Sequence, residues 1–311
     1  GLSSFFQNIN FLSFVIAKPN IFVILIYYII LFLSIKRNRK LLIIYFIVLL
    51  ININIKYFIR DASVTFLDVG QGDSSVIILP FGKTILIDTG GLYLSRYNIS
   101  KNKTVPYLNS LGISKIDILI LTHGDYDHMG EAINLVNNFK VKKVIFNCGE
   151  FNDLEKKLIK VLDKKKIKYY SCIKELNIDN NKLYFLQTKE YDNENDNSNV
   201  IYTELDGYKF MFMGDAGIDK EKDILDKYNL SNVDVLKVGH HGSKTSTGSS
   251  FIKKINPKYS IISVGENNRY GHPNNEALKN LANSKIYRTD LDGSIEIKLN
   301  KNGYKIRTCP P

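Results

Sequence analysis

The sequence predicts an α/β domain with mixed β-sheets faced by helices, preceded by a short segment of transmembrane helices. Residues 61–311 alternate short β-branched runs with helix-like stretches, and glycine, aspartate or asparagine bounds most of the runs. Residues 1–60 are apolar and contain no Asp or Glu. The whole chain is 44% hydrophobic and 23% charged, a composition typical of a protein that buries a core.

The net charge of +11 is concentrated near the start of the chain. Residues 1–60 hold seven Lys or Arg and no acid, so residues 61–311 carry 35 basic and 31 acidic residues. An excess of +4 over that length is mild. Net charge alone therefore does not identify a nucleic-acid-binding domain.

Two apolar segments of the N-terminal region are predicted to cross a membrane. They run from about residue 17 to 35 and from 41 to about 59, and each approaches the roughly 20 residues that a hydrocarbon core requires. The loop KRNRK between them carries four positive charges, which favours the cytoplasm and places residues 61–311 outside it. A signal peptide or a buried helical hairpin is the alternative. Because the chain opens with Gly1 and more apolar residues, we expect the C-terminal part of a longer membrane protein.

Strand and helix signals alternate through the rest of the chain. An early, hairpin-rich group of strands is expected at residues 64–69, 74–80 and 83–89. Later strands are expected at 116–122, 141–146, 182–188, 199–205, 208–214, 233–238, 259–264 and 294–299. Helices are expected near 104–111, 130–138, 151–165, 218–229, 247–255 and 274–283.

The cysteines restrict the chemistry of any metal site. Cys148, Cys172 and Cys309 lie far apart without a C-x-x-C pair, and their odd number argues against a disulfide framework and a thiolate zinc site. A metal site must therefore use histidine and carboxylate ligands. All five histidines stand in loop-like sequence contexts, so none is expected to be a core histidine.

The strongest chemical signal is LTHGDYDHMG at residues 121–130, directly after an apolar strand. One strand-to-helix turn here contains four nitrogen or oxygen donors: His123, Asp125, Asp127 and His128. Zinc and other divalent ions take such ligands. A single H-x-D pair is usually a solvated turn, but four donors in one turn indicate a metal site.

Two further strands are followed by potential ligands. Asp215 follows YKFMFM, and the pair His240 and His241 follows VDVLKV. Alone, each has a structural interpretation, as a Gly-Asp turn or an exposed histidine pair. Three strand ends with potential ligands at one sheet edge indicate an active site.

Seven motifs, in order, resemble the metallo-β-lactamase-type hydrolase domain at the C-terminus of ComEC-type DNA-internalisation (competence) membrane proteins. They are DVGQGDSSVI, LIDTGG, LTHGDYDHMGEA, NDNSNVI, MGDAG, LKVGHHGSKTS and YGHPN, within residues 62–300. The resemblance implies an αββα sandwich over residues 61–311, with a two-metal site at the sheet edge. It also implies that residues 1–60 are the last helices of a larger membrane domain.

The resemblance implies a ligand set for two divalent ions, zinc or manganese. The ligands would be His123, Asp125, Asp127, His128, Asp215 and His240. The first two would hold one ion, the next two the second ion, and Asp215 would bridge both. One histidine of the 240/241 pair would complete the second site, and we assign His240 to the metal.

The chain departs from the superfamily pattern in two places. It has H-x-D-x-D-H where H-x-H-x-D-H is usual, and the carboxylate of Asp125 makes manganese a competitor of zinc. The separate histidine ligand of the superfamily is missing, because NDNSN stands in that region and Asp196 or Asn197 would ligate only weakly. Occupancy of both metal positions is therefore an open question.

The implied chemistry is hydrolysis of a phosphodiester. Two cations would lower the pKa of a bridging water and hold phosphate oxygens. Asp127 or Asp215 would orient the nucleophile, and His241, Lys244 and His272 would stabilise the developing charge or protonate the leaving oxygen. Alternatively, His272 is a turn residue without a catalytic role.

The glycine turns DVGQGDSS and LIDTGG are expected to hold the sheet edge. Their acids Asp68, Asp73 and Asp88 are accordingly expected to be structural.

These features favour a metal-dependent phosphodiesterase, namely a nuclease acting on DNA, single- or double-stranded, during uptake through a competence membrane channel. Its partners would be DNA, the membrane and other components of the uptake machinery, with DNA contacts from Lys237, Lys244 and Arg269. One alternative is another extracytoplasmic metallo-hydrolase, of the phosphocholine esterase or lactonase type. The other is a non-catalytic, metal-stabilised DNA-binding module of the transporter.

Overall fold

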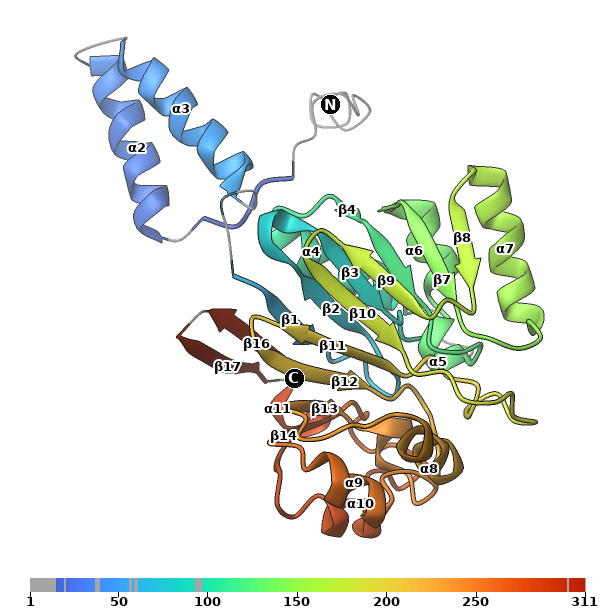
Figure 1. Cartoon of the computed structure of the whole chain (residues 1–311). Coiled ribbons are helices and arrows are strands. Elements are labelled where there is room, and N and C mark those ends of the chain that lie inside the picture. The colour runs from blue at the N-terminus through green and yellow to red at the C-terminus, as the bar shows by residue number, and fades with distance from the viewer. Residues whose placement is uncertain are drawn as a thin grey trace. The chain divides into compact units, whose positions relative to one another are not determined.

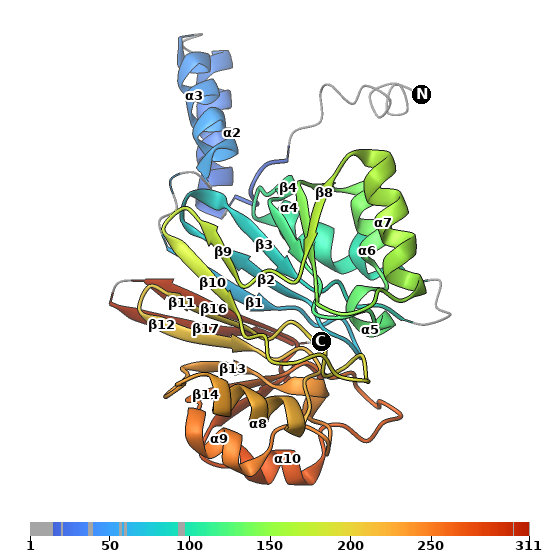
Figure 2. The same ribbon diagram turned by 45° about the vertical axis from the view of Figure 1, so that its right-hand side comes forward.

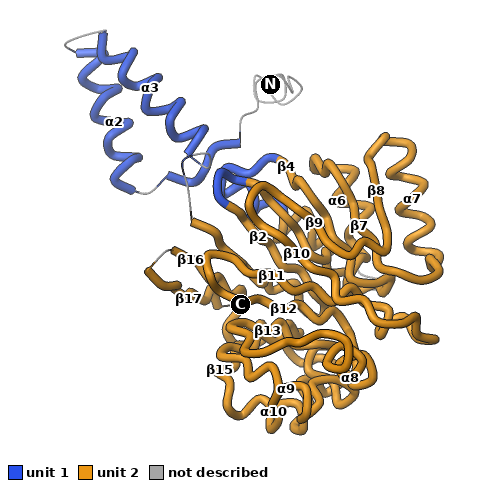
Figure 3. Tube along the Cα trace, viewed as in Figure 1, with its two compact units in different colours: residues 1–60, 80–82, 105–114 blue, residues 61–79, 83–104, 115–311 orange. Residues whose placement is uncertain are grey.

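A computed structural model describes residues 15–19, 21–36, 40–55, 58, 61–92, 97–300 and 302–310. The chain divides into two compact units (Figure 3). The first unit comprises residues 1–60, 80–82 and 105–114, and the second comprises residues 61–79, 83–104 and 115–311.

The first unit contains a pair of apolar helices, α2 (Ile21–Lys36) and α3 (Leu41–Ile53). They pack on each other through Tyr27, whose ring lies 5.7 Å from that of Tyr45. Two short elements belong to the same unit, the 3₁₀ turn η3 (Pro80–Gly82) and the helix α4 (Val105–Ser110).

The predicted transmembrane spans are not confirmed. With 16 and 13 residues, α2 and α3 fall short of a bilayer, and no helix in the described ranges is long and apolar enough to cross one. Of the basic loop KRNRK, residues 37–39 lie outside the described residues.

Two mixed β-sheets form the centre of the second unit (Figure 1). In spatial order, the first sheet consists of β17 (Gly303–Cys309), β16 (Ser294–Asn300), β1 (Ser63–Phe66), β2 (Ser75–Ile78), β3 (Thr84–Ile87), β5 (Ile118–Ile120), β7 (Lys143–Phe146) and β8 (Lys168–Ser171). The second consists of β15 (Lys285–Arg288), β14 (Tyr259–Ile262), β13 (Val235–Lys237), β12 (Tyr208–Phe212), β11 (Ile201–Leu205), β10 (Asn181–Phe185) and β9 (Glu175–Ile178). Strands β4 (Lys115–Ile116) and β6 (Lys140–Val141) form a separate two-stranded sheet.

The two sheets pack face to face around one apolar core. Phe66 of the first sheet and Phe212 of the second are fully buried there, with ring centroids 5.9 Å apart. Successive side chains of a strand point to opposite faces, so Met211 turns away from this core toward the other side of the second sheet. Each sheet therefore has two buried faces, which explains the nearly continuous apolar runs of the central strands.

Helices cover the outer face of each sheet (Figure 2). The first sheet is covered by α6 (Ala132–Asn138) and α7 (Asp153–Lys165), and the second by α8 (Ile218–Lys227), α9 (Ser249–Ile255) and α10 (Asn275–Asn280). Ile224 and Phe251 bury against the outer face of the second sheet. The remaining short elements are η4 (Ser100–Thr104), α5 (Tyr126–Met129), η5 (Gly239–Gly242) and α11 (Thr289–Asp292). The predicted αββα layering is confirmed.

The cysteine spacing argued against a disulfide framework, but the structure contains one disulfide, between Cys148 and Cys172. They follow β7 and β8, which are parallel neighbours with Phe146 opposite Ser171, so the ends of these strands bring the two thiols together. Cys309 is the odd cysteine, free and exposed.

Removing this disulfide should destabilise the domain. A bond across a separation of 24 residues restricts the unfolded chain, so the double substitution Cys148→Ser with Cys172→Ser should lower the free energy of unfolding by about 3 kcal/mol. Urea unfolding under non-reducing conditions measures the change. Cys309→Ser is the control and should shift the value by less than about 0.5 kcal/mol; equal stability of the two variants would contradict the assignment.

Candidate metal centre

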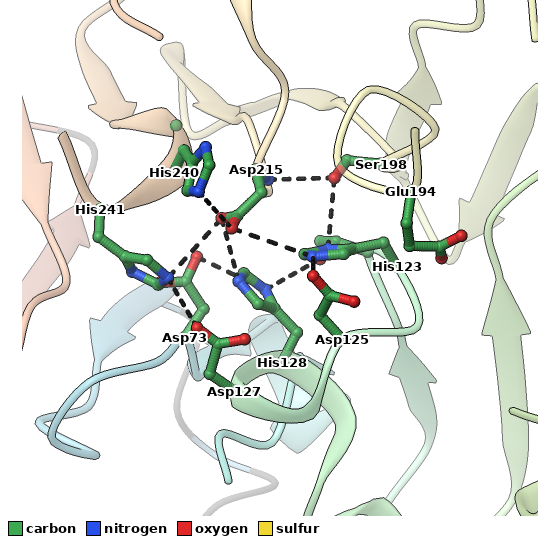
Figure 4. A network of polar contacts seen from close by, with 12 residues as sticks. Asp73, His123, Asp125, Asp127, His128, Glu194, Ser198, Asp215, His240 and His241 are labelled. Atoms are coloured by element: carbon green, nitrogen blue, oxygen red, sulfur yellow. Dashed lines mark hydrogen bonds and ion pairs between the residues drawn. The ribbon is translucent and has the colours of Figure 1, made fainter. Parts of the chain in front are cut away.

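Polar side chains from several strand ends meet at one edge of the two sheets (Figure 4). The 121–130 turn follows β5, Asp215 follows β12, and the histidine pair follows β13. Asp73 precedes β2, which runs antiparallel to β3, so its position falls at this same edge. The topology thus brings together segments that are up to about 170 residues apart in the sequence.

The turn at residues 121–130 is held by a buried carboxylate. Asp88 accepts hydrogen bonds from the Thr122 amide at 2.8 Å and from its hydroxyl at 2.7 Å. On the other side, the Asp73 amide donates to the Asp127 carbonyl at 3.1 Å. Gly72 lies so close to that carbonyl that a Cβ there would collide with it, which explains a glycine at this position.

His128 is fully buried and oriented by two carboxylates. Its Nδ1 lies 2.8 Å from Asp88 Oδ2, and its Nε2 lies 3.0 Å from Asp215 Oδ1. Burial alone would lower the pKa of His128, but Asp215 and then Asp88 raise it well above its ordinary value. The pKa of Asp215, which burial would raise, is conversely held well below its usual range by His128 and His241.

His123 and His241 approach Asp215 from either side. His123 Nε2 lies 3.6 Å from Asp125 Oδ2 and 4.0 Å from Asp215 Oδ2. His241 Nε2 lies 3.2 Å from Asp127 Oδ2 and 3.8 Å from Asp215 Oδ1. Nδ1 of His241 is 2.9 Å from the Ser263 carbonyl, a contact that requires a proton on Nδ1 and leaves Nε2 free as a ligand.

The donor set fits divalent cations. Among the described residues, five buried atoms at this edge form no hydrogen bond of ordinary geometry: Nε2 of His123, His128 and His241, and one carboxylate oxygen each of Asp73 and Asp215. Nε2 of His128 and Nε2 of His241 have carboxylate oxygens at 3.0 and 3.2 Å, as ion pairs only. Buried polar atoms without partners are rare in proteins, and imidazole and carboxylate are the ligands of zinc and manganese. The ligand atoms of His123, His128 and Asp215 lie within 4.8 Å of one another, as do those of Asp127, His128 and His241.

The two histidines of the pair differ in environment. His241 is 2% exposed and belongs to one of these compact groups. The side chain of His240 is 25% exposed, its Nε2 lies 3.7 Å from Asp215 Oδ2, and its Nδ1 lies 3.2 Å from the Thr245 hydroxyl. The geometry therefore favours His241 as the ligand, contrary to the expected division of roles. Both adopt left-handed backbone conformations, with φ of 49° and 53°, which are uncommon outside glycine and often found at functional sites.

The other predicted catalytic residues lie on the open side of the cluster. Lys244 and His240 line a pocket of about 670 Å³ that reaches Asp215. The ring of His272 lies 5.9 Å from that of His240. Partial burial, followed by the charges of His241 and His240, lowers the pKa of His272.

A buried ion pair that the sequence analysis missed supports the cluster. Lys237 is 2% exposed, and its ammonium lies 2.6 Å from Asp73 Oδ2, while Asp73 Oδ1 lies 3.5 Å from His241 Nδ1. Burial alone would raise the pKa of Asp73, but Lys237 lowers it well below its ordinary value. The expected contact of Lys237 with DNA is therefore wrong. A lysine inside the apolar strand VDVLKV, next to the histidine pair, was the available signal.

The segment NDNSN supplies no histidine but still supports the site. Ser198 Oγ accepts a hydrogen bond from the Asp215 amide at 3.0 Å and lies 3.3 Å from His123 Nδ1. Asp196 is engaged elsewhere, since its carboxylate accepts from the Gly217 amide at 2.7 Å. Glu194, just before it, accepts from the Gly124 amide at 2.7 Å and so holds the turn between two predicted ligands.

Comparison with known proteins agrees with this geometry. A family model described as the metallo-beta-lactamase superfamily matches residues 67–266. The chain is 32% identical over 269 residues to ComE operon protein 3 of Bacillus subtilis strain 168, covering 81% of this chain and 35% of that protein. It is 31% identical over 255 residues to Competence protein ComA of Neisseria gonorrhoeae, covering 79% and 33%. The chain thus spans about a third of the length of these curated relatives.

A solved structure shares the fold. CmlA, a diiron beta-hydroxylase from Streptomyces venezuelae, superposes with a TM-score of 0.53 at 12% identity, covering 77% of this chain and 54% of that one. At this identity the likeness is one of fold.

Breaking the buried ion pair should be costly. Lys237→Met leaves the Asp73 carboxylate buried without its cation and should lower the unfolding free energy of the metal-free protein by about 3–5 kcal/mol. The double variant Lys237→Met with Asp73→Asn removes that charge and should recover most of the loss. Urea unfolding in EDTA measures both; a double variant no more stable than Lys237→Met would contradict the pairing.

The two histidines should differ in metal affinity. His241→Asn removes a donor from a compact group and should weaken Zn²⁺ or Mn²⁺ binding by at least about a hundredfold, whereas His240→Asn should cost less than about tenfold. Titration of the full chain against a competing chelator dye measures both. The reverse ranking would restore His240 as the ligand.

Proposed function

The chain belongs to the metallo-β-lactamase superfamily, and we propose that it is a metal-dependent phosphodiesterase that cleaves DNA during uptake at a membrane. The observation that carries the proposal is the group of buried imidazole nitrogens and carboxylate oxygens that converge at this edge without hydrogen bonds of ordinary geometry. His123 and Asp125 would hold one ion, and Asp127, His128 and His241 the other. Asp215 lies within 4.0 Å of all the histidines named here and would bridge the two positions.

Divalent ions bound there would supply Lewis acidity and lower the pKa of water to near neutrality. Asp127, whose side chain is one-third exposed, would orient the attacking water. His240 and Lys244 face the open pocket and would bind the phosphate oxygens. His272, with its lowered pKa, would be neutral at pH 7, so it would bind the leaving group by hydrogen bonding rather than by charge.

DNA as the substrate is supported by the sequence resemblance and by the relatives. One relative is named a competence protein, and Recombination protein 2 of Haemophilus influenzae is 27% identical over 252 residues. Of the three cations expected to contact DNA, Lys244 and Arg269 are exposed and line two separate pockets, one that also includes Asp215 and one that also includes Asp127.

The missing histidine favours one second candidate, a metal-stabilised binding module without turnover. Ser198 stands in the NDNSN segment and contacts His123 Nδ1 rather than offering an imidazole to the ions. This candidate predicts metal binding and DNA binding without hydrolysis.

The disulfide supports an extracytoplasmic position for the domain, since such bonds persist in oxidising compartments. Cys309, free and exposed, is a natural probe of this proposal. A membrane-impermeant maleimide should label it in intact cells, with Cys309→Ser as the unlabelled control. Labelling only after lysis would reverse the orientation.

Replacing Asp127 tests the proposed activity. Asp127→Ala removes a ligand and a charge from a partly exposed position, so Mn²⁺-dependent hydrolysis of single-stranded DNA and of bis(4-nitrophenyl) phosphate should fall by at least about a hundredfold. Metal-free thermal stability should change little, because the core is untouched.

Near-full turnover by Asp127→Ala would show that the assigned site is wrong. Tight metal binding by the unsubstituted chain without any turnover would instead favour the binding module.

A further inference from the structure

A second pocket, of about 390 Å³, opens beside Asp127. Its lining includes two aromatic side chains and one cation, Tyr126, Tyr270 and Arg269. Tyr126 is 38% exposed and Tyr270 is 54% exposed, so both rings offer surface to a ligand. We call this group the aromatic pocket.

Tyr270 is held in place by its neighbours. Its ring stacks on that of His272, with centroids 5.8 Å apart and planes 12° apart. The Arg269 guanidinium lies 5.0 Å from the ring centroid and donates to the Tyr270 hydroxyl at 3.0 Å. An aromatic ring that is largely exposed thus lies next to a positive charge.

The loop that carries Tyr270 is itself ordered by hydrogen bonds. The Asn268 amide group donates to the carbonyls of Gly265 and His272, at 3.1 and 2.8 Å, and its oxygen accepts from the His272 amide. Gly265 in turn donates to Gln71 Oε1 at 3.1 Å, which ties this loop to the glycine turn that precedes Asp73.

Tyr126, the other aromatic residue of the lining, is fixed by close packing against glycine backbone. A Cβ at Gly130 would stand 2.7 Å from two carbons of the Tyr126 ring, so the ring rests directly on backbone that lacks a side chain. Tyr126 is also the first residue of α5, one position before Asp127. Its place relative to the metal ligands is therefore set by the same turn.

We propose that the aromatic pocket receives an unpaired nucleobase adjacent to the phosphodiester that is cleaved. This inference rests on the proposed function and names its substrate class as single-stranded nucleic acid. Nucleobases stack on aromatic rings irrespective of sequence, and an arginine beside the ring adds attraction for the backbone phosphate. The volume of the aromatic pocket lies near the lower end of the range for small-ligand sites, so it suits one nucleoside rather than a duplex.

Charge-matched oligonucleotides separate stacking from electrostatic attraction. The probes are a fluorescein-labelled ten-nucleotide thymidine strand, the same strand with abasic positions, and a duplex of equal length. The metal-free full chain should bind the thymidine strand at least about tenfold more tightly than either of the others in fluorescence anisotropy.

Variants of the aromatic pocket locate that preference. Tyr270→Ala should reduce the ratio of thymidine-strand to abasic-strand affinity by about tenfold, whereas Tyr270→Phe, which keeps the ring, should retain it. Tyr170→Ala is the matched control, because Tyr170 is a comparably exposed tyrosine on β8 and not part of the pocket lining. An unchanged ratio in Tyr270→Ala, or equal binding of duplex and single strand by the unsubstituted chain, overturns the inference.

Hydrolysis of methyl 4-nitrophenyl phosphate, a diester without a nucleobase, separates this inference from the proposed function. Turnover of that diester with no preference for base-containing strands retains the phosphodiesterase and overturns the nucleobase pocket. A base preference that depends on Tyr270, without turnover of any diester, supports the pocket and contradicts the proposed activity.

Discussion

Negative charge buried at one sheet edge is the constraint on which the rest of the site depends. Asp73, Asp88 and Asp215 are each at least 95% buried, and Lys237 places a buried ammonium 2.6 Å from Asp73. Carboxylates withdrawn from water are unfavourable unless cations or hydrogen-bond donors compensate them. Raised pKa values of His128 and His241 provide part of the compensation in the metal-free state. Divalent ions would provide it fully, and would also satisfy the histidine nitrogens that lack hydrogen-bond partners.

The fold positions that charge by topology rather than by local sequence. Strands β3 and β5 are parallel, as are β12 and β13, so the segments that follow them emerge where the two sheets meet. Pairing of these buried strands brings together site residues that are far apart in the sequence. Thr122 and Ser198 then orient the imidazoles through hydroxyl groups, and Asp88 links the turn to His128.

Central strands and the main ligand turn were predictable, because both leave strong local signals. Buried strands such as VDVLKV are apolar throughout, and four donors in LTHGDYDHMG fall within six residues. The strands that the sequence analysis missed include β8, β9, β15 and β17, which are the four edges of the two sheets. Edge strands are partly exposed and carry charged residues, so their pattern resembles that of loops.

Other features of the structure depend on contacts that no local pattern encodes. The disulfide depends on the register of β7 and β8, and the Lys237–Asp73 pair joins β13 to the turn that precedes β2. The choice between His240 and His241 depends on two left-handed backbone angles in η5, which turn one ring inward and leave the other partly exposed. Such features arise from the tertiary structure, so they could be recognised only once the structure was known.

The most direct measurement of this account is a crystal structure of the chain grown with Mn²⁺ or Zn²⁺, with anomalous diffraction data. Two anomalous peaks are expected near Asp215, one within bonding distance of His128 Nε2 and His241 Nε2, and the other beside His123 Nε2. No peak at these atoms, or a single ion held by His240 and His272 instead, would contradict it.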